Sequence, residues 1–140
     1  MNKKVLISVK TVQFIDGQPE SVELITQGEY HKEGNEYFAE YDESEISGME
    51  GTKTIMKINE DTLRIVRSGT TTSDLMFKKG YDHLSLYNTP FGTLEVMIKP
   101  RKVDIDVNED GGNVKLEYKM EAFGLDTIEN ALELNIKQIN

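Results

Sequence analysis

Apolar and charged residues alternate in the segment Val114-Lys115-Leu116-Glu117-Tyr118-Lys119-Met120-Glu121. The segment Leu132-Glu133-Leu134-Asn135-Ile136-Lys137 shows the same two-residue period near the end of the chain. Successive side chains of a β-strand point to opposite faces, so this pattern predicts a sheet with one apolar face and one solvated face. Because no segment shows a 3.6-residue apolar period over more than two turns, the sequence predicts an all-β protein.

Turn-forming residues separate the alternating runs at the spacing of β-hairpins. Examples are Asp16-Gly17, Ser68-Gly69 and Asp110-Gly111-Gly112. We expect one extended segment to break near Pro100 and two neighbouring segments to merge across a bend. The expected segments are residues 3–14, 20–28, 29–33, 36–43, 52–58, 62–68, 73–79, 83–88, 93–108, 113–121 and 129–138.

A sheet of this many strands, with short connections and one apolar face, is expected to close, because closure removes exposed strand edges. We therefore predict a single domain over residues 1–140, folded as a closed antiparallel up-and-down β-barrel of about 8–10 strands. A two-sheet sandwich is the alternative, but the short turns favour the barrel. Residues 42–51 form the main irregular insertion, and residues 123–127 form a longer loop.

The composition limits the possible compartments and partners. The chain has no cysteine, which excludes disulfides and fits a reducing compartment. The first seven residues run directly into alternating sequence and no membrane-spanning stretch is present, so we expect a cytoplasmic protein without membrane insertion. A formal net charge of −9 and dispersed Lys and Arg residues argue against nucleic-acid binding.

Acidic residues gather in one part of the chain, where Lys32 is the one full cation that faces them. They are Glu29, Glu33, Glu36, Glu40, Asp42, Glu43, Glu45 and Glu50. We interpret this segment as a solvated rim, because net charge of this kind chiefly serves solubility. An acidic docking patch for a protein partner is the alternative.

Several short motifs, taken together, are similar to those of a known family. They are Tyr41-Asp42-Glu43, Gly51-Thr52-Lys53-Thr54, Arg67-Ser68-Gly69, Tyr87-Asn88-Thr89-Pro90-Phe91-Gly92, Leu116-Glu117-Tyr118 and Leu132-Glu133-Leu134-Asn135-Ile136. The set resembles the YwiB-like family of small Firmicute proteins along the whole length of the chain. That resemblance implies a lipocalin-like, calycin-type barrel in a bacterial protein of unknown function, and it supplies no catalytic residues.

One motif matches the spacing of a calcium-binding loop. It begins with Asp106-Val107-Asn108-Glu109-Asp110-Gly111, and Glu117 follows after five residues. An EF-hand needs a helix on each side, whereas the flanking residues alternate as strands. We therefore predict a hairpin turn, with weak adventitious calcium binding at its tip as the alternative. His31 and His83 have no partner at metal-binding spacing, so we expect no metal site and no cofactor.

Arg67 is the first candidate for ligand binding. In Leu63-Arg64-Ile65-Val66-Arg67, the two-residue period places Arg67 on the same face as Leu63 and Ile65. An inward guanidinium needs an anion or a wet barrel mouth, because an unpaired buried charge is costly. Its forked geometry suits a carboxylate. The alternatives are an internal pair with an inward Asp or Glu, and a solvated arginine at the rim.

Two tyrosines complete the set of candidate ligand-binding residues. Tyr118 shares the apolar face with Leu116, whereas Tyr41 lies in a segment with aromatic residues on both faces. A phenol that reaches a cavity could join Arg67 in holding a head group. The alternative for each tyrosine is a core position with a satisfied hydroxyl group.

The sequence favours a binding function over catalysis. It contains neither a G-x-S-x-G nucleophile motif nor a phosphate-binding glycine loop, so we propose no catalytic residues. The favoured interpretation is a non-catalytic cytoplasmic barrel that binds a small apolar or anionic ligand. A protein-interaction module with a packed core, which uses the acidic loop or a strand edge, is the alternative. An enzyme that acts on a bound ligand is the third hypothesis.

Overall fold

The computed structural model describes residues 2–15, 17–44, 49–122 and 127–139. These residues contain ten β-strands and no helix. The strands are β1 (Lys3–Ile15), β2 (Gln18–Glu33), β3 (Glu36–Asp42), β4 (Thr52–Ile58), β5 (Thr62–Gly69), β6 (Ser73–Lys78), β7 (His83–Thr89), β8 (Gly92–Asn108), β9 (Gly111–Ala122) and β10 (Ile128–Gln138).

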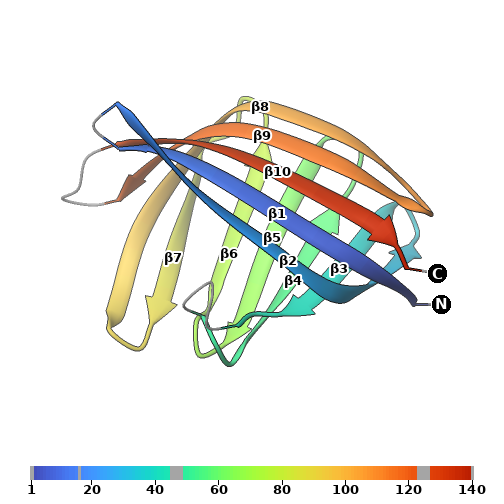
Figure 1. The fold of residues 1–140 in the computed structure, drawn as a ribbon. Helices are drawn as coiled ribbons and strands as arrows, with labels where there is room; N and C mark the ends of the chain where they lie inside the picture. The colour runs from blue at the N-terminus through green and yellow to red at the C-terminus, as the bar shows by residue number, and fades with distance from the viewer. Residues whose placement is uncertain (1, 16, 45–48, 123–126, 140) are drawn as a thin grey trace.

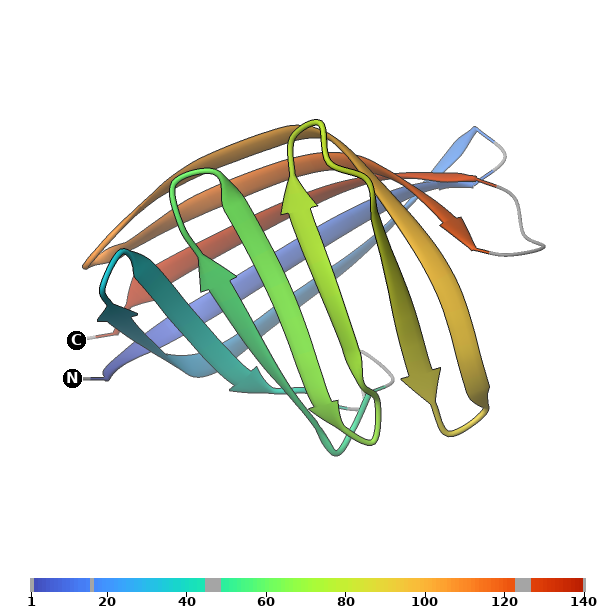
Figure 2. The ribbon, with the colours of Figure 1, turned by 180° about the vertical axis from the view of Figure 1, so that it is seen from behind.

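The strands form one antiparallel sheet that curls into a barrel (Figures 1 and 2). Its order is β6-β5-β4-β3-β2-β1-β10-β9-β8-β7, so each strand lies beside its neighbour in the sequence and β1 pairs with β10. The predicted all-β up-and-down barrel is confirmed. It is nearly closed between β6 and β7, where Thr72 and Asn88 exchange two backbone hydrogen bonds of 2.9 Å.

Most of the expected segments correspond to these strands. The expected merger joins residues 20–28 and 29–33 into the single strand β2. The break expected near Pro100 is absent: β8 is continuous there and shows only a register shift between Pro100 and Lys102. Parts of the expected insertion and of the longer loop, residues 45–48 and 123–126, lie outside the described residues.

The motif with calcium-loop spacing is a β-hairpin, as predicted. Asn108 at the end of β8 pairs with Gly111 at the start of β9. The backbone N–H of Asp110 donates to Oδ1 of Asn108 over 2.8 Å, and this hydrogen bond closes the turn. The strands on both sides carry Glu117 away from the turn, so the spacing does not produce an EF-hand.

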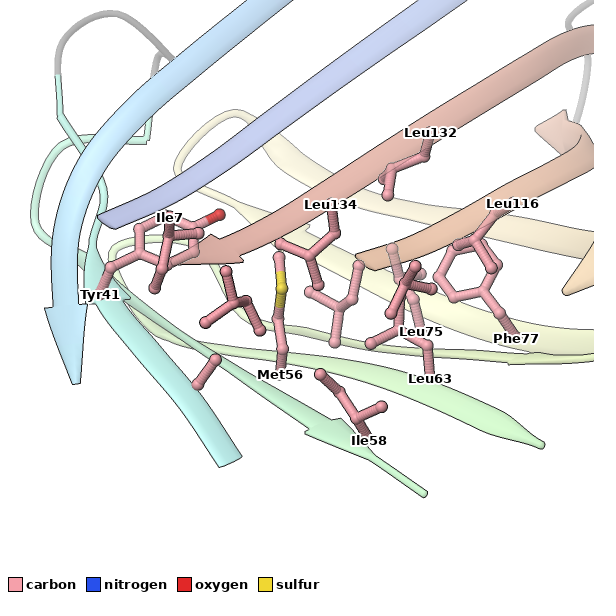
Figure 3. Packing of buried hydrophobic residues seen from close by; sticks show 14 of the residues in the cluster. Ile7, Tyr41, Met56, Ile58, Leu63, Leu75, Phe77, Leu116, Leu132 and Leu134 are labelled. Carbon is pink, nitrogen blue, oxygen red and sulfur yellow. The ribbon is translucent and has the colours of Figure 1, made fainter. Parts of the chain in front are cut away.

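Apolar rows across the strands fill the barrel. Residues that face each other on neighbouring strands share one face of the sheet, and two rows cross the wall from β3 to β6. They are Tyr37-Ile58-Leu63-Phe77 and Ala39-Met56-Ile65-Leu75. Figure 3 shows several of these side chains packed against Leu116, Leu132 and Leu134. Full burial of one such side chain stabilises the fold by about 2 kcal/mol.

An aromatic contact links the two walls of the barrel. Phe77 from β6 packs edge-on against Tyr118 from β9, with 4.8 Å between the ring centroids. Edge-to-face pairs of this kind contribute about 1 kcal/mol beyond their buried area. Because β6 and β9 are not neighbours in the sheet, the contact helps to fix how far the barrel closes.

Candidate functional site

The candidate site exists because β2 separates from β3 at Gly28. β2 pairs with β1 from Gln18 to Tyr30, but it pairs with β3 only from Glu29 to Glu33. A Cβ atom at Gly28 would collide with the carbonyl oxygen of Glu40 and with Cδ1 of Ile7. Glycine therefore permits the close approach at the point of separation.

Beyond Gly28, residues 19–27 of β2 form the edge of the sheet and pair, among the described strands, only with β1, and residues 9–14 of β1 stay paired with β10 on the other side (Figure 1). We call residues 9–14 and 19–27 the β1–β2 arm. A cavity of about 310 Å³, which we call the arm cavity, lies against its inner face. The arm contributes Val9, Thr11, Gln13, Glu20, Val22 and Leu24 to the lining. The facing wall consists of Tyr41, Glu43, Met49 and Arg67.

The interior becomes polar next to this cavity. The row that follows Ala39-Met56-Ile65-Leu75 is Tyr41-Thr54-Arg67-Ser73, in which each residue pairs with the next across neighbouring strands. Tyr41, Thr54 and Ser73 are buried, and Figure 3 shows Tyr41 among the apolar side chains of the core. The chain thus places hydroxyl groups and a guanidinium at one end of an otherwise apolar interior.

Glu43 is the buried partner of Arg67. The distance from Nε of Arg67 to Oε2 of Glu43 is 3.9 Å, and the two side chains are 13% and 1% exposed, respectively. The Thr54 hydroxyl donates to the same carboxylate oxygen over 3.2 Å. The backbone N–H of Glu43 donates to the carbonyl oxygen of Thr52 over 2.8 Å, which holds Glu43 beside the start of β4.

The expectation that Glu43 belongs to a solvated rim is wrong. The two-residue period offered a signal, because Glu43 shares its parity with Ala39 and Tyr41, whose side chains are both buried. The acidic residues around Glu43 indicated a solvated segment instead, although the two-residue period indicated an inward side chain. Glu43 can be buried because Thr54 of β4 gives it a hydrogen bond and Arg67 of β5 gives it a positive charge.

The hydrogen-bonding capacity of the pair is only partly used. Nη1 of Arg67 donates to the Tyr87 hydroxyl over 3.2 Å, and that hydroxyl contacts Sδ of Met49 at 3.6 Å. Within the described part of the chain, buried Nε of Arg67 and Oε1 of Glu43 have no hydrogen-bond partner. Buried polar atoms without partners are uncommon in folded proteins, and a functional role is one explanation for them.

Burial raises the pKa values of one carboxyl group and two phenol groups at this end of the barrel. Burial raises the pKa of Glu43, whereas Arg67 and the hydroxyls of Thr54 and Tyr41 oppose that rise. Burial, together with the charge of Glu43, also raises the pKa of Tyr41 above its ordinary value. Burial raises the pKa of Tyr118 to about 12, and Arg67 again opposes the shift. Arg67 therefore acts electrostatically on all three groups.

The three sequence candidates occupy two environments. Arg67 and Tyr41 line the arm cavity, and Arg67 shares the inward face of β5 with Leu63 and Ile65. Tyr118 does not line the cavity; it packs against Phe77 in the core, within electrostatic reach of Arg67. The contact with Glu43 matches the internal-pair alternative for Arg67, and a ligand-binding role for all three residues stays a prediction.

The two histidines do not line the arm cavity. Over residues 2–15, 17–44, 49–122 and 127–139, no group of three or more His, Cys, Asp or Glu side chains could hold a metal ion. His31 stacks on Phe38, with 5.0 Å between the ring centroids, and His83 contacts the carbonyl oxygen of Asp74 at 3.1 Å. The chemistry available at the arm cavity is therefore that of carboxylate, guanidinium, phenol and hydroxyl groups.

A family model described as a domain of unknown function, DUF1934, matches residues 7–134. The chain belongs to the DUF1934 family. A curated relative of this DUF1934 chain is the "Uncharacterized beta-barrel protein YwiB" of Bacillus subtilis (strain 168). The two are 29% identical over 117 residues, which cover 83% of this chain and 80% of the relative. The predicted resemblance to the YwiB-like family is confirmed.

The fold of this DUF1934 chain also matches an experimental structure. The crystal structure of the ywiB protein from Bacillus subtilis matches it with a TM-score of 0.87 at 24% sequence identity. The match covers 99% of this chain and 94% of the other. In the part of the chain that the structure describes, no helix is long and apolar enough to cross a membrane.

Proposed function

We propose that this DUF1934 protein binds a small amphipathic molecule in the arm cavity. The observation that carries the proposal is Arg67, a largely buried guanidinium that makes one hydrogen bond to the described residues and lines a cavity of about 310 Å³. The apolar part of the molecule would lie against the arm, and its polar head group would lie at Arg67 and Tyr41.

The lining of the cavity supports this assignment. Binding sites for small molecules combine apolar walls with a few convergent polar groups, and their volumes begin at about 300 Å³. Here Val9, Val22 and Leu24 supply one apolar wall, and Met49 adds adaptable apolar surface opposite. The core beyond the cavity is filled by packed side chains, so we place the ligand at this end of the barrel rather than along its axis.

We propose a binding role rather than catalysis. The described lining residues include no Ser, Cys or His, the side chains that most often form an activated nucleophile and its base. The pair Arg67–Glu43 suits recognition through charge and hydrogen bonds. We also propose that the protein works in the cytoplasm, which its lack of cysteine supports.

Native mass spectrometry of the protein purified from its own host tests the proposal. We expect a stoichiometric small-molecule adduct on the wild type and its loss from Val22→Trp, which fills the cavity from the arm. The matched control is Ile25→Trp: Val22 and Ile25 are 58% and 57% exposed, but Ile25 lies on the opposite face of β2. An adduct that persists in Val22→Trp, or that is absent from the wild type, would contradict the proposal.

A second candidate function rests on the unpaired edge of β2. From Gln18 to Gln27, β2 pairs with β1 and with no other described strand. An exposed edge of this kind can receive an extended segment of a partner protein. Glu20 and Glu23 favour a segment that carries basic residues.

Amide hydrogen exchange tests whether the edge of β2 receives a partner segment. An alternating Lys-Val peptide should slow amide exchange in residues 18–27, whereas an alternating Glu-Val peptide of the same length should not. If neither peptide slows exchange, or if both do so equally, the edge is not a selective docking strand for basic segments.

A further inference from the structure

The arm cavity contains more negative than positive charge. Arg67 is the one cation among the described lining residues, whereas Glu20 and Glu43 are both acids. Glu43 already lies 3.9 Å from Arg67 and is almost completely shielded from solvent. Because charges interact strongly at low effective dielectric, an anionic head group beside Arg67 would also be repelled by Glu43.

The unused hydrogen-bonding atoms have opposite character. Nε of Arg67 is a donor, Oε1 of Glu43 is an acceptor, and neither has a partner among the described residues. The Thr54 hydroxyl donates to Oε2 and the Tyr41 hydroxyl also acts on the carboxyl group, but Oε1 has no donor among the described residues. A carboxylate ligand could accept from Arg67, but it has no proton to give to Glu43.

The contact between Arg67 and Glu43 is loose. A separation of 3.9 Å is wider than a hydrogen bond, so the two side chains are not locked together. Among the described residues, the guanidinium makes a single hydrogen bond, to Tyr87. Both residues line the arm cavity, so a head group that enters the cavity meets the guanidinium and the carboxylate together.

From these observations we infer that the head group is uncharged and both donates and accepts hydrogen bonds, as a primary amide does. This inference rests on the proposed binding function and names its ligand class. The amide oxygen accepts from Arg67, the amide N–H donates to Glu43, and the alkyl part lies against the arm. An anionic ligand, one of the two kinds that the sequence favoured, suits Arg67 alone, whereas an amide suits the observed pair.

The test compares three ligands that share one alkyl chain: octanamide, octanoate and octylammonium. Isothermal titration calorimetry at about pH 8 should show octanamide binding to the wild type about ten-fold more tightly than either ion. Glu43→Gln should reverse the order of octanamide and octanoate, because it removes the buried negative charge. The matched control is Glu23→Gln, which removes an exposed acid beside Lys10 on the outer face of the arm and should leave the order unchanged.

Each outcome has a defined meaning. Tighter binding of octanoate or octylammonium than of octanamide to the wild type would overturn the inference, while the proposed function would stand. Equal effects of Glu43→Gln and Glu23→Gln would overturn it as well, because the preference would then reflect overall charge. If none of the three ligands binds the wild type, the inference fails, and a retained adduct in native mass spectrometry shows whether the proposed function fails with it.

Discussion

Nε of Arg67 lies 3.9 Å from Oε2 of Glu43, where the apolar interior of the barrel gives way to the arm cavity. The distance defines an ion pair and exceeds a hydrogen bond. Arg67 belongs to β5 and Glu43 follows β3, and Thr54 of β4 connects them by pairing with Arg67 and donating to Glu43. The pair is therefore a tertiary contact between segments that lie apart in the sequence.

Arg67→Met should destabilise the ligand-free protein. The substitution leaves the Glu43 carboxylate buried without its cation, and breaking one side of a buried pair costs about 3 kcal/mol. Urea denaturation at about pH 7.5 measures the free energy of unfolding. Arg67 is partly exposed and the pair is loose, so we expect a loss at or below this figure.

A double-mutant cycle separates the pair from simple loss of packing. Arg67→Met combined with Glu43→Gln should be more stable than Arg67→Met alone, because the double variant has no isolated buried charge. If the two substitutions are additive in the free energy of unfolding, the 3.9 Å contact contributes nothing to stability.

Glu43 should make stability depend on pH. Burial raises its folded-state pKa above the ordinary value of 4.5, so the folded protein binds more protons than the unfolded chain between those two values. The contribution of Glu43 to stability is therefore largest below pH 4.5 and is lost as pH rises through the folded pKa. A glutamine side chain cannot titrate, so Glu43→Gln should gain stability relative to the wild type as pH increases from about 4 to about 8. A pH-independent difference between the two would contradict this reasoning.

Gly28→Ala should destabilise the barrel. The added methyl group would collide with the Glu40 carbonyl oxygen and the Ile7 side chain. Overpacking of this kind costs about 1–3 kcal/mol. Thermal and urea denaturation should show this loss, whereas Gln27→Ala, at the exposed neighbouring position, should be close to neutral. Equal effects of the two substitutions would show that the close approach at Gly28 is unimportant.

Calcium should not stabilise the protein. The hairpin turn holds Asn108 by its hydrogen bond to the Asp110 amide, and the strand β9 carries Glu117 away from the turn. Melting temperatures with calcium and with chelator should agree, whereas Asn108→Ala should cost about 1 kcal/mol in either condition. A calcium-dependent rise in melting temperature that disappears in Asp110→Asn would show that the turn is a genuine ion site.

Much of the fold follows from local sequence rules. Alternation over Val114–Glu121 and Leu132–Lys137 specifies strands with one buried face, and short turns between them specify antiparallel neighbours. The merger within β2 was also expected. The break expected at Pro100, where proline cannot donate a ladder hydrogen bond, is only a register shift within β8. The pairing of β1 with β10 follows from closure of a meander of this length.

The sequence by itself determined the strands, their order and the inward direction of Arg67, because each depends on local periodicity and short connections. Only the tertiary structure decided that Glu43 meets Arg67, that Tyr41 reaches the cavity and that Tyr118 lies in the core. The two-residue period tells which face a side chain occupies, but contacts between distant strands depend on register and closure. The separation of β2 from β3 at Gly28 is a matter of packing between three strands, and no single stretch of sequence encodes it.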